Sequence, residues 1–155
     1  MNVILEVTGR VRKSRSFDYR ALAALPGQVE DVAAVLPGRE GSGVRLEAIL
    51  ASVEPDDDAD HVTLESTDGS FSASVPLDAV AQRGIVVYRM GTAPLSPAKG
   101  GPARFFIEDA ESCGLAEVDA CANVKDLGRI VLSAGPGRDL RPATISEHEA
   151  LHEHG

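Results

Sequence analysis

The sequence has no tryptophan, two cysteines and only 4% aromatic residues in 155 positions. With so few cysteines, a framework of disulfides cannot stabilise the fold, so a hydrophobic core must do so. An apolar content of 43% suits that core, and the length suits one main domain. Its apolar runs fall short of the roughly 20 residues that a helix needs to cross a bilayer, so we expect no membrane partner.

Basic residues are also in deficit, with 15 Lys and Arg against 24 Asp and Glu and a formal net charge of -9. This charge opposes nonspecific attraction to nucleic acid and to anionic lipid, so we expect neither as a partner. In residues 1–16 the apolar run precedes the basic cluster, which is the reverse of a secretory signal. We therefore expect a mature, cytoplasmic protein.

Hydrophobic periodicity predicts strands interspersed with short helices. The strands are expected at 3–7, 29–36, 85–90, 103–109 and 128–133, and the helices at 17–26, with Ser16 as N-cap, at 44–53 and at 78–84. Residues 61–77 alternate on both sides of Asp68-Gly69, which is typical of a β-hairpin. Because no regular βαβ repeat is present, we predict an α+β fold with mixed or antiparallel sheets.

The chain is expected to divide into a packed domain, residues 1–134, and a Gly/Pro linker with a His/Glu-rich tail, residues 135–155. Within the tail, "HEALH" (148–152) matches the pattern in which two His bind zinc and a Glu activates water. Ser146 and Glu149 also form a capping box for a short helix, which favours a lightly docked tail. A metal-dependent hydrolase is therefore the weakest of the functional alternatives.

The acidic loop and the two cysteines are ambiguous. Asp56, Asp58 and Asp60 alternate like calcium ligands, but the positions that need Gly and a bidentate Glu hold other residues, which favours a solvated loop. For Cys113 and Cys121 three alternatives remain open: a reduced pair, a disulfide, or half of a tetrahedral metal shell. These residues predict no metal site.

Four cations lie near the Gly-rich loop and the last predicted strand, namely Lys99, Arg104, Lys125 and Arg129. If they converge, ammonium and guanidinium groups would form an anion-binding spot. The alternative is that they are ordinary surface cations that offset nearby carboxylates. Ser/His/Asp catalysis has no support, because the sequence has no GxSxG elbow.

The order of motifs resembles the molybdopterin-binding domain of the sulfite oxidase family. The matching stretches, within residues 3–133, are "LEVTGRV", "GVRLEAIL", "VTLESTDGSFSASVPL", "VVYRMGTAPLSPAKGGPARFFI" and "CANVKDLGRIVL". The resemblance implies an α+β fold with mixed, barrel-like sheets and short helices. It also implies that Arg104, Asn123 and Lys125 lie near the pterin phosphate or a substrate oxyanion.

The sequence departs from the family where catalytic relatives anchor molybdenum through a cysteine, because the corresponding stretch, 29–46, contains none. A soft thiolate ligand cannot be replaced by Ala or Val. The upstream segment with which the family encloses the pterin is also not recognised. We therefore expect a binding or accessory module without conventional molybdenum catalysis, and no resident cofactor except the molybdopterin that the resemblance implies. The expected partners are a small anionic ligand or pterin and a second protein, and the alternative function is a molybdenum-cofactor-dependent oxidoreductase or a subunit of one.

Overall fold

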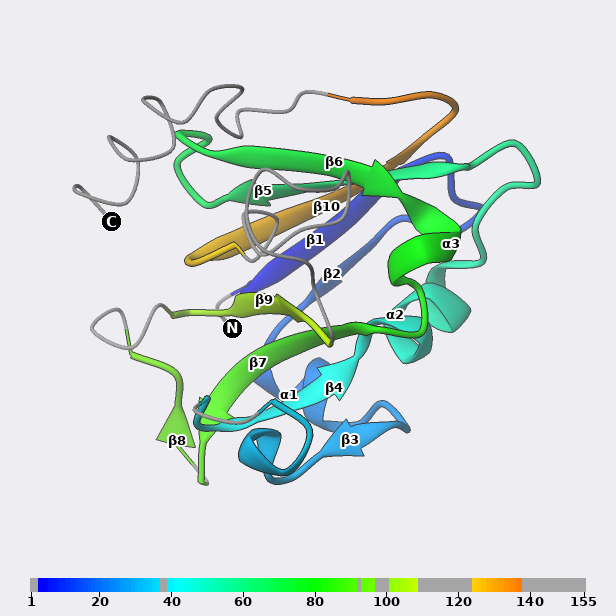
Figure 1. Ribbon diagram of the computed structural model, residues 1–155. Helices are drawn as coiled ribbons and strands as arrows, with labels where there is room; N and C mark the ends of the chain where they lie inside the picture. The colour runs from blue at the N-terminus through cyan, green and yellow to red at the C-terminus, as the bar shows by residue number, and fades with distance from the viewer. Residues whose placement is uncertain (1–2, 37–38, 92, 97–100, 109–123, 138–155) are drawn as a thin grey trace.

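The computed structural model describes residues 3–36, 39–91, 93–96, 101–108 and 124–137. Their strands form two five-stranded sheets, which Figure 1 shows one above the other, with α2 and α3 at the right-hand side. Sheet 1 has the order β2-β1-β10-β5-β6, and sheet 2 has the order β3-β4-β7-β8, with β9 also paired to β7.

The strands of sheet 1 are β1 (Leu5–Gly9), β2 (Arg15–Phe17), β5 (His61–Ser66), β6 (Ser72–Pro76) and β10 (Leu127–Ser133). Those of sheet 2 are β3 (Gln28–Val29), β4 (Ser42–Arg45), β7 (Gly84–Met90), β8 (Ala93–Pro94) and β9 (Arg104–Ile107). The helices are α1 (Tyr19–Ala23), α2 (Leu46–Val53), α3 (Leu77–Val80) and the 3-10 helix η1 (Val32–Ala34).

Strand pairing confirms the α+β class. In sheet 1, β1 runs parallel to β10, while the other neighbours pair antiparallel, so the sheet is mixed. In sheet 2 the described pairs are antiparallel. The barrel-like character that the resemblance implies is not confirmed, because the strand pairs of the described residues form two separate sheets.

The main core lies between the two sheets and is closed by α2. Leu5 and Ile130 enter it from sheet 1, Val86 and Phe105 from sheet 2, and Ile49 from α2. All five side chains are fully buried. Short strands and helices are enough to form this core, because each strand contributes one apolar face to a shared interior.

A second, smaller core covers the outer face of sheet 2. Successive side chains of a strand point to opposite faces, so Val86 and Tyr88 of β7 enter the main core while Ile85 and Val87 enter the smaller one. Phe106 of β9 belongs to the smaller core too. The prediction that 85–90 is a strand buried on both faces is therefore confirmed.

The hairpin predicted for residues 61–77 is confirmed by the antiparallel pairing of β5 with β6. In the turn, Asp68 Oδ1 accepts hydrogen bonds from Ser70 N at 2.9 Å and from Ser66 Oγ at 3.0 Å. Gly69 has a φ of 73°, a conformation that glycine adopts without a steric penalty. The Asp-Gly turn and the alternation on both sides of it were therefore sufficient to predict this hairpin.

The strand predicted for 29–36 is wrong. Only Gln28–Val29 pairs in a sheet, and the chain then turns into η1. Asp31 causes this turn, because its side chain accepts a hydrogen bond from Ala33 N at 3.1 Å and so caps the 3-10 helix. Val32 is buried from within the helical turn, which accounts for the apolar pattern that favoured a strand.

Two helix boundaries also differ from prediction. Asp18, not Ser16, is the N-cap of α1, because its Oδ1 accepts from Ala21 N at 2.8 Å, whereas Ser16 lies in β2. The second helix begins at Leu46, since residues 42–45 form β4. A Cβ at Gly43 would overlap the carbonyl of Val86, so glycine permits β4 to lie this close to β7.

After β10 the chain bends back over sheet 1. Gly135 N donates to Asp60 Oδ1 at 2.7 Å, and Gly137 N donates to Ser74 Oγ at 2.8 Å. The domain boundary between 134 and 135 stays a prediction. Lys99, Cys113, Cys121, Asn123 and the 148–152 motif lie outside the described residues. Among the described residues, no helix combines the length and the apolar character that a membrane crossing requires.

Candidate functional site

Arg104 is the first residue of β9 and lies on the outer face of sheet 2. The register pairs Arg104 with Val87 and Phe106 with Ile85, so the two β9 side chains share the face of the smaller core. The Arg104 guanidinium carbon lies 4.7 Å from the centroid of the Phe106 ring. Phe106 itself is buried, and it therefore fixes the position of the charge above it.

A second guanidinium contacts the same ring. Arg39 lies just before β4, and its guanidinium carbon is 4.8 Å from the centroid of Phe106. The pKa of Arg104 is lowered, first by burial of its guanidinium and then by the charge of Arg39. Two like charges on one aromatic ring repel each other, and an anion beside them would relieve that repulsion.

Arg89, near the end of β7, does not join this pair. The register between β4 and β7 shifts between Ser42 and Gly43, so the alternation of β7 does not continue unbroken from Val87 to Arg89. The Arg89 guanidinium carbon lies 5.6 Å from the centroid of the Tyr88 ring, which belongs to the main core. The Arg89 Nε is buried and has no hydrogen-bond partner among the described residues. A buried donor without a partner is costly unless a ligand or water accepts from it.

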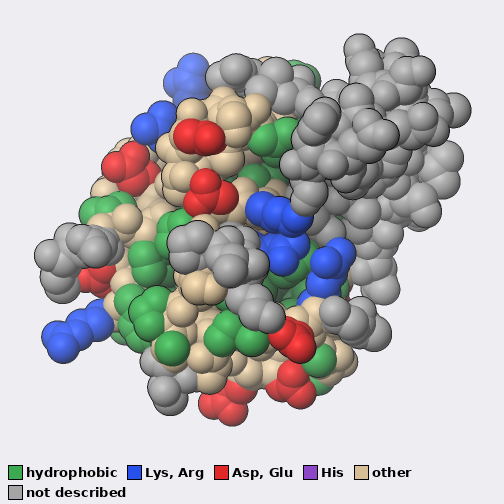
Figure 2. Space-filling model, turned by 90° about the vertical axis from the view of Figure 1, so that its left-hand side faces the viewer, with side chains coloured by type: hydrophobic (Ala, Val, Ile, Leu, Met, Phe, Trp, Pro, Cys, Tyr) green, Lys and Arg blue, Asp and Glu red, His purple; other side chains and the backbone are tan. Residues whose placement is uncertain are grey.

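We call Arg39 and Arg104 the arginine cluster. It lies where β9 begins, at the left-hand side of Figure 1. Figure 2, which faces this side of the molecule, shows Lys and Arg side chains close together. In a chain of net charge -9, this gathering of cations forms a local positive region suited to an anion.

Lys125 is brought next to Arg104 by the backbone. Phe105 N donates to Val124 O at 2.8 Å, and Val124 N donates to Phe105 O at 3.1 Å. Because these two residues exchange both hydrogen bonds, the residues that flank them, Arg104 and Lys125, lie opposite each other. The structure therefore unites two of the three residues predicted to hold a cofactor, while Asn123 lies outside the described residues.

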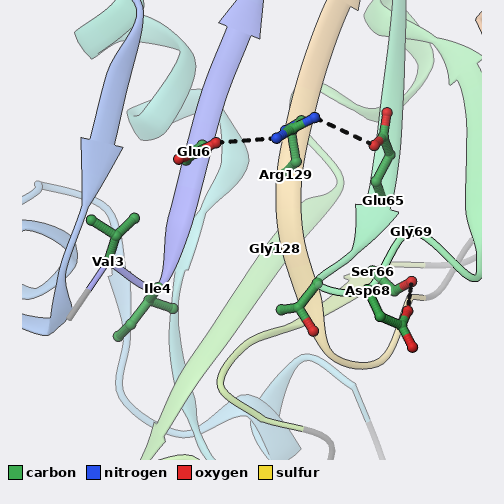
Figure 3. Close-up of a pocket in the computed structure, with 10 residues that line it drawn as sticks. Val3, Ile4, Glu6, Glu65, Ser66, Asp68, Gly69, Gly128 and Arg129 are labelled. Atoms are coloured by element: carbon green, nitrogen blue, oxygen red, sulfur yellow. Dashed lines mark hydrogen bonds and ion pairs between the residues drawn. The ribbon is translucent and has the colours of Figure 1, made fainter.

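Arg129 does not join the cluster. It lies on β10 in sheet 1, and its guanidinium nitrogens contact Glu6 Oε2 at 3.4 Å and Glu65 Oε1 at 4.0 Å. Figure 3 shows Arg129 between these two carboxylates. The role predicted for it as part of a shared anion-binding spot is therefore not supported, since its charge is already paired.

The ion pairs of Arg129 form part of a hollow of about 450 Å³ on the outer face of sheet 1 (Figure 3). Its carboxylates come from Glu6, Glu65 and Asp68. Asp68 is occupied by its hydrogen bonds within the β5–β6 turn, which lower its pKa, and the two Glu face Arg129. Among the described residues, no three His, Cys, Asp or Glu side chains converge as a metal site would require.

The acidic loop is arranged as a solvated loop rather than as a cation site. Asp58 contacts Arg10 at 3.9 Å, and Asp60 contacts His61 Nδ1 at 2.9 Å. The pKa of Asp60 is lowered by its hydrogen bonds, first with the His61 side chain and then with the backbone of Gly135. These carboxylates therefore serve local contacts, as the interpretation of the loop as a surface segment predicted.

Arg39 was not predicted from the sequence. It does not stand in a stretch that singles it out, and its association with Arg104 depends on the pairing of β7 with both β4 and β9. Local sequence does not reveal which strand contributes the partner, because strand register is set by packing of the whole sheet.

Comparison with known proteins supports the fold. A family model described as "Oxidoreductase molybdopterin binding domain" matches residues 39–136, a range that contains the arginine cluster and Lys125. The crystal structure of the sulfane dehydrogenase SoxCD from Paracoccus pantotrophus is similar, with a TM-score of 0.61 and 19% sequence identity. The similarity covers 86% of this chain and 39% of that chain. No curated protein matches the sequence.

Proposed function

The chain belongs to the oxidoreductase molybdopterin binding domain family, and on this premise we propose that it is a binding or accessory module that holds an anionic ligand at the arginine cluster. The ligand class is a phosphate ester, of which the phosphate of molybdopterin is the member that the family suggests. Conventional molybdenum catalysis is not part of the proposed role.

The convergence of Arg39 and Arg104 on the single ring of Phe106 carries this proposal. Guanidinium groups bind phosphate oxygens through paired, charge-assisted hydrogen bonds. Phe106 holds two of these groups in place. A phosphate at this position would offset the repulsion between the two stacked cations.

The residues fit the anionic part of molybdopterin better than its metal. The arginine cluster offers donors for a phosphate, and Lys125 stands beside it. For molybdenum, a soft thiolate is needed, and residues 29–46, where catalytic relatives carry that cysteine, contain none. We therefore assign these residues the task of holding the phosphate and derive no redox step from them.

The alternative is a molybdenum-cofactor-dependent oxidoreductase, or a subunit of one, in which a partner chain completes the site. The similarity in fold to a sulfane dehydrogenase favours it, together with the fact that this chain covers only 39% of that protein's length. A partner would have to supply the thiolate ligand and enclose the cofactor.

Isothermal titration of the full chain with pyrophosphate at low salt tests the proposal. Arg104→Gln should weaken binding about tenfold or more, because a hydrogen bond to a charged group contributes roughly 1.5–3 kcal/mol. Arg39→Gln should act in the same direction. Circular dichroism would verify that each variant is folded.

Arg129→Gln is the matched control, since it removes an exposed arginine from the other sheet. Its affinity for pyrophosphate should equal that of the unaltered chain. Equal weakening by Arg129→Gln and Arg104→Gln would show that only the overall charge matters, and the arginine cluster would not be the binding site.

A further inference from the structure

A second depression, distinct from the arginine cluster, has an apolar lining. It has a volume of about 510 Å³ and is lined by Val3, Ile4, Asp18, Tyr19, Arg20, Pro94 and Pro102. We call it the apolar groove. Neither arginine of the cluster lines it. Its size falls within the range of about 300–1,000 Å³ that is usual for small-molecule sites.

Val3, which lines the groove, has an unusually exposed apolar side chain. Its side chain is 55% exposed, and it is the one large hydrophobic side chain exposed among the described residues. Figure 2 shows hydrophobic side chains at the surface on the side of the molecule where β8 and the start of β9 lie. A single exposed apolar side chain is common on protein surfaces, and Val3 also lines the hollow around Arg129, so its exposure supports a ligand contact only together with the other apolar residues of the groove.

The walls of the groove are held in place by hydrogen bonds of the fold. Ile4 N donates to Phe17 O at 2.7 Å, which fixes the segment of Val3 and Ile4 against β2. The ring of Tyr19 packs edge-on against Tyr88, with 5.5 Å between their centroids. A preformed wall of this kind reduces the entropy that a ligand must lose on binding.

The opposite wall is fixed in the same way. Leu95 N donates to Tyr88 O at 3.0 Å, and Gly101 N donates to Ser96 O at 2.8 Å. These bonds hold the backbone next to Pro94 and Pro102, the two residues that line the groove on this side. Both sides of the groove therefore exist before any ligand arrives.

The lining of the groove holds one carboxylate, Asp18, and one guanidinium, Arg20. Asp18 is engaged as the N-cap of α1, where its Oδ1 accepts from Ala21 N. Arg20 is exposed and its side chain has no hydrogen bond or ion pair within the part of the chain that the structure describes. The groove thus combines apolar walls and an aromatic ring with one cation that is available to a ligand.

We propose that the apolar groove binds a small aromatic or aliphatic molecule with a single anionic group, a carboxylate or a sulfonate. The apolar body of the ligand packs on Val3, Pro94 and Pro102, and its anionic group pairs with Arg20. This site is separate from the phosphate site of the proposed function, and neither depends on the other.

The test uses the dye 8-anilinonaphthalene-1-sulfonate, which carries an aromatic body and one sulfonate, and monitors its fluorescence with the folded full chain. One dye should bind per chain. Arg20→Gln should weaken binding about threefold to tenfold, as expected for a partly exposed ion pair. Val3→Asp should weaken it further, because it places a negative charge among the apolar contacts. The neutral dye N-phenyl-1-naphthylamine should respond to Val3→Asp but not to Arg20→Gln.

Arg15→Gln provides the matched control, because Arg15 is a nearby exposed arginine on β2 that does not line the groove. Dye binding that is insensitive to both Arg20→Gln and Val3→Asp would overturn the inference. Loss of binding in Arg104→Gln alone would assign the dye to the arginine cluster, which also overturns it. Sedimentation that shows a dimer dissociated by Val3→Asp would identify a second copy as the occupant and exclude the small ligand.

Discussion

The side chain of Tyr88 shows how a single buried polar group joins three elements. Its hydroxyl donates to Gln28 Oε1 at 2.6 Å, and Gln28 Nε2 donates to the carbonyl oxygens of Leu22 and Leu25 at 2.8 and 3.0 Å. This chain of bonds connects β7 with β3 and with the end of α1. Burial is the main cause of the raised pKa of Tyr88.

Tyr88→Phe should lower the free energy of unfolding at pH 7 by about 1–2 kcal/mol, because it leaves the Gln28 oxygen without its donor. Urea denaturation followed by circular dichroism would measure the change. Gln28→Ala provides the matched background, since Tyr88→Phe should cost less in a chain that already lacks the acceptor. The same cost in both backgrounds would show that the hydrogen bond between the two side chains contributes nothing.

The same substitution changes the response to alkaline pH. The pKa of Tyr88 in the folded chain lies above the ordinary value of 10.0, so above that pH the unfolded chain loses a proton that the folded chain keeps. Stability should therefore fall as pH rises beyond about 10. Tyr88→Phe should lack this part of the loss, and an identical pH profile for both proteins would contradict the role given to the hydroxyl.

At the scale of single residues, the sequence predicted one part of the site and not another. Arg104 and Lys125 were predicted from the motifs "GGPARF" and "NVKDL", and the backbone places them opposite each other. Arg39 was not predicted, because a residue of this kind becomes part of a site only through strand register. Register depends on packing of the whole sheet and not on the local sequence.

At the scale of elements, β9 is fixed to the rest of sheet 2 at its far end by Glu108. The carboxylate accepts from Arg45 Nη1 at 2.7 Å, and the backbone carbonyl of Glu108 accepts from Arg83 Nε at 2.8 Å. Arg45 belongs to β4, so the ion pair connects the two strands that flank β7. Because β9 begins with Arg104, these bonds also position the arginine cluster.

Glu108→Gln should lower the free energy of unfolding by about 1 kcal/mol, between the small effect of an exposed pair and the larger effect of a buried one. The side chains of Arg45 and Glu108 are 27% and 26% exposed, which places the pair in this intermediate range. Chemical denaturation would measure the effect, with Glu47→Gln on the exposed face of α2 as control. Equal values for the two variants would show that the ion pair does not anchor β9.

Helices and strands with strong local signals in the sequence were predicted correctly, and those with weak signals were not. The hairpin of β5 and β6 was predicted because its turn and its alternation agree, and β7 because a strand buried on both faces is apolar throughout. The strand predicted at 29–36 failed, since Asp31 caps a 3-10 turn within an apolar stretch. Apolar content without alternation does not distinguish these conformations.

At the scale of the whole molecule, two sheets around one core place the ends of β7 and β9 at a common surface. This surface carries positive charge in a chain whose net charge is -9, and the match to the molybdopterin binding domain family includes it. The fold class was predictable from the interspersed elements and the order of motifs. The assembly of the arginine cluster was not, because it requires residues from two separate segments.

The central claim is that this fold holds a phosphate ligand without conventional molybdenum catalysis. The direct measurement is elemental analysis for molybdenum, together with fluorescence analysis for oxidised pterin, on the full chain purified from cells that make the cofactor. The account predicts molybdenum far below one atom per chain, whether or not pterin is retained. One molybdenum atom per chain, with oxidation or reduction of a small oxo-substrate, would contradict it.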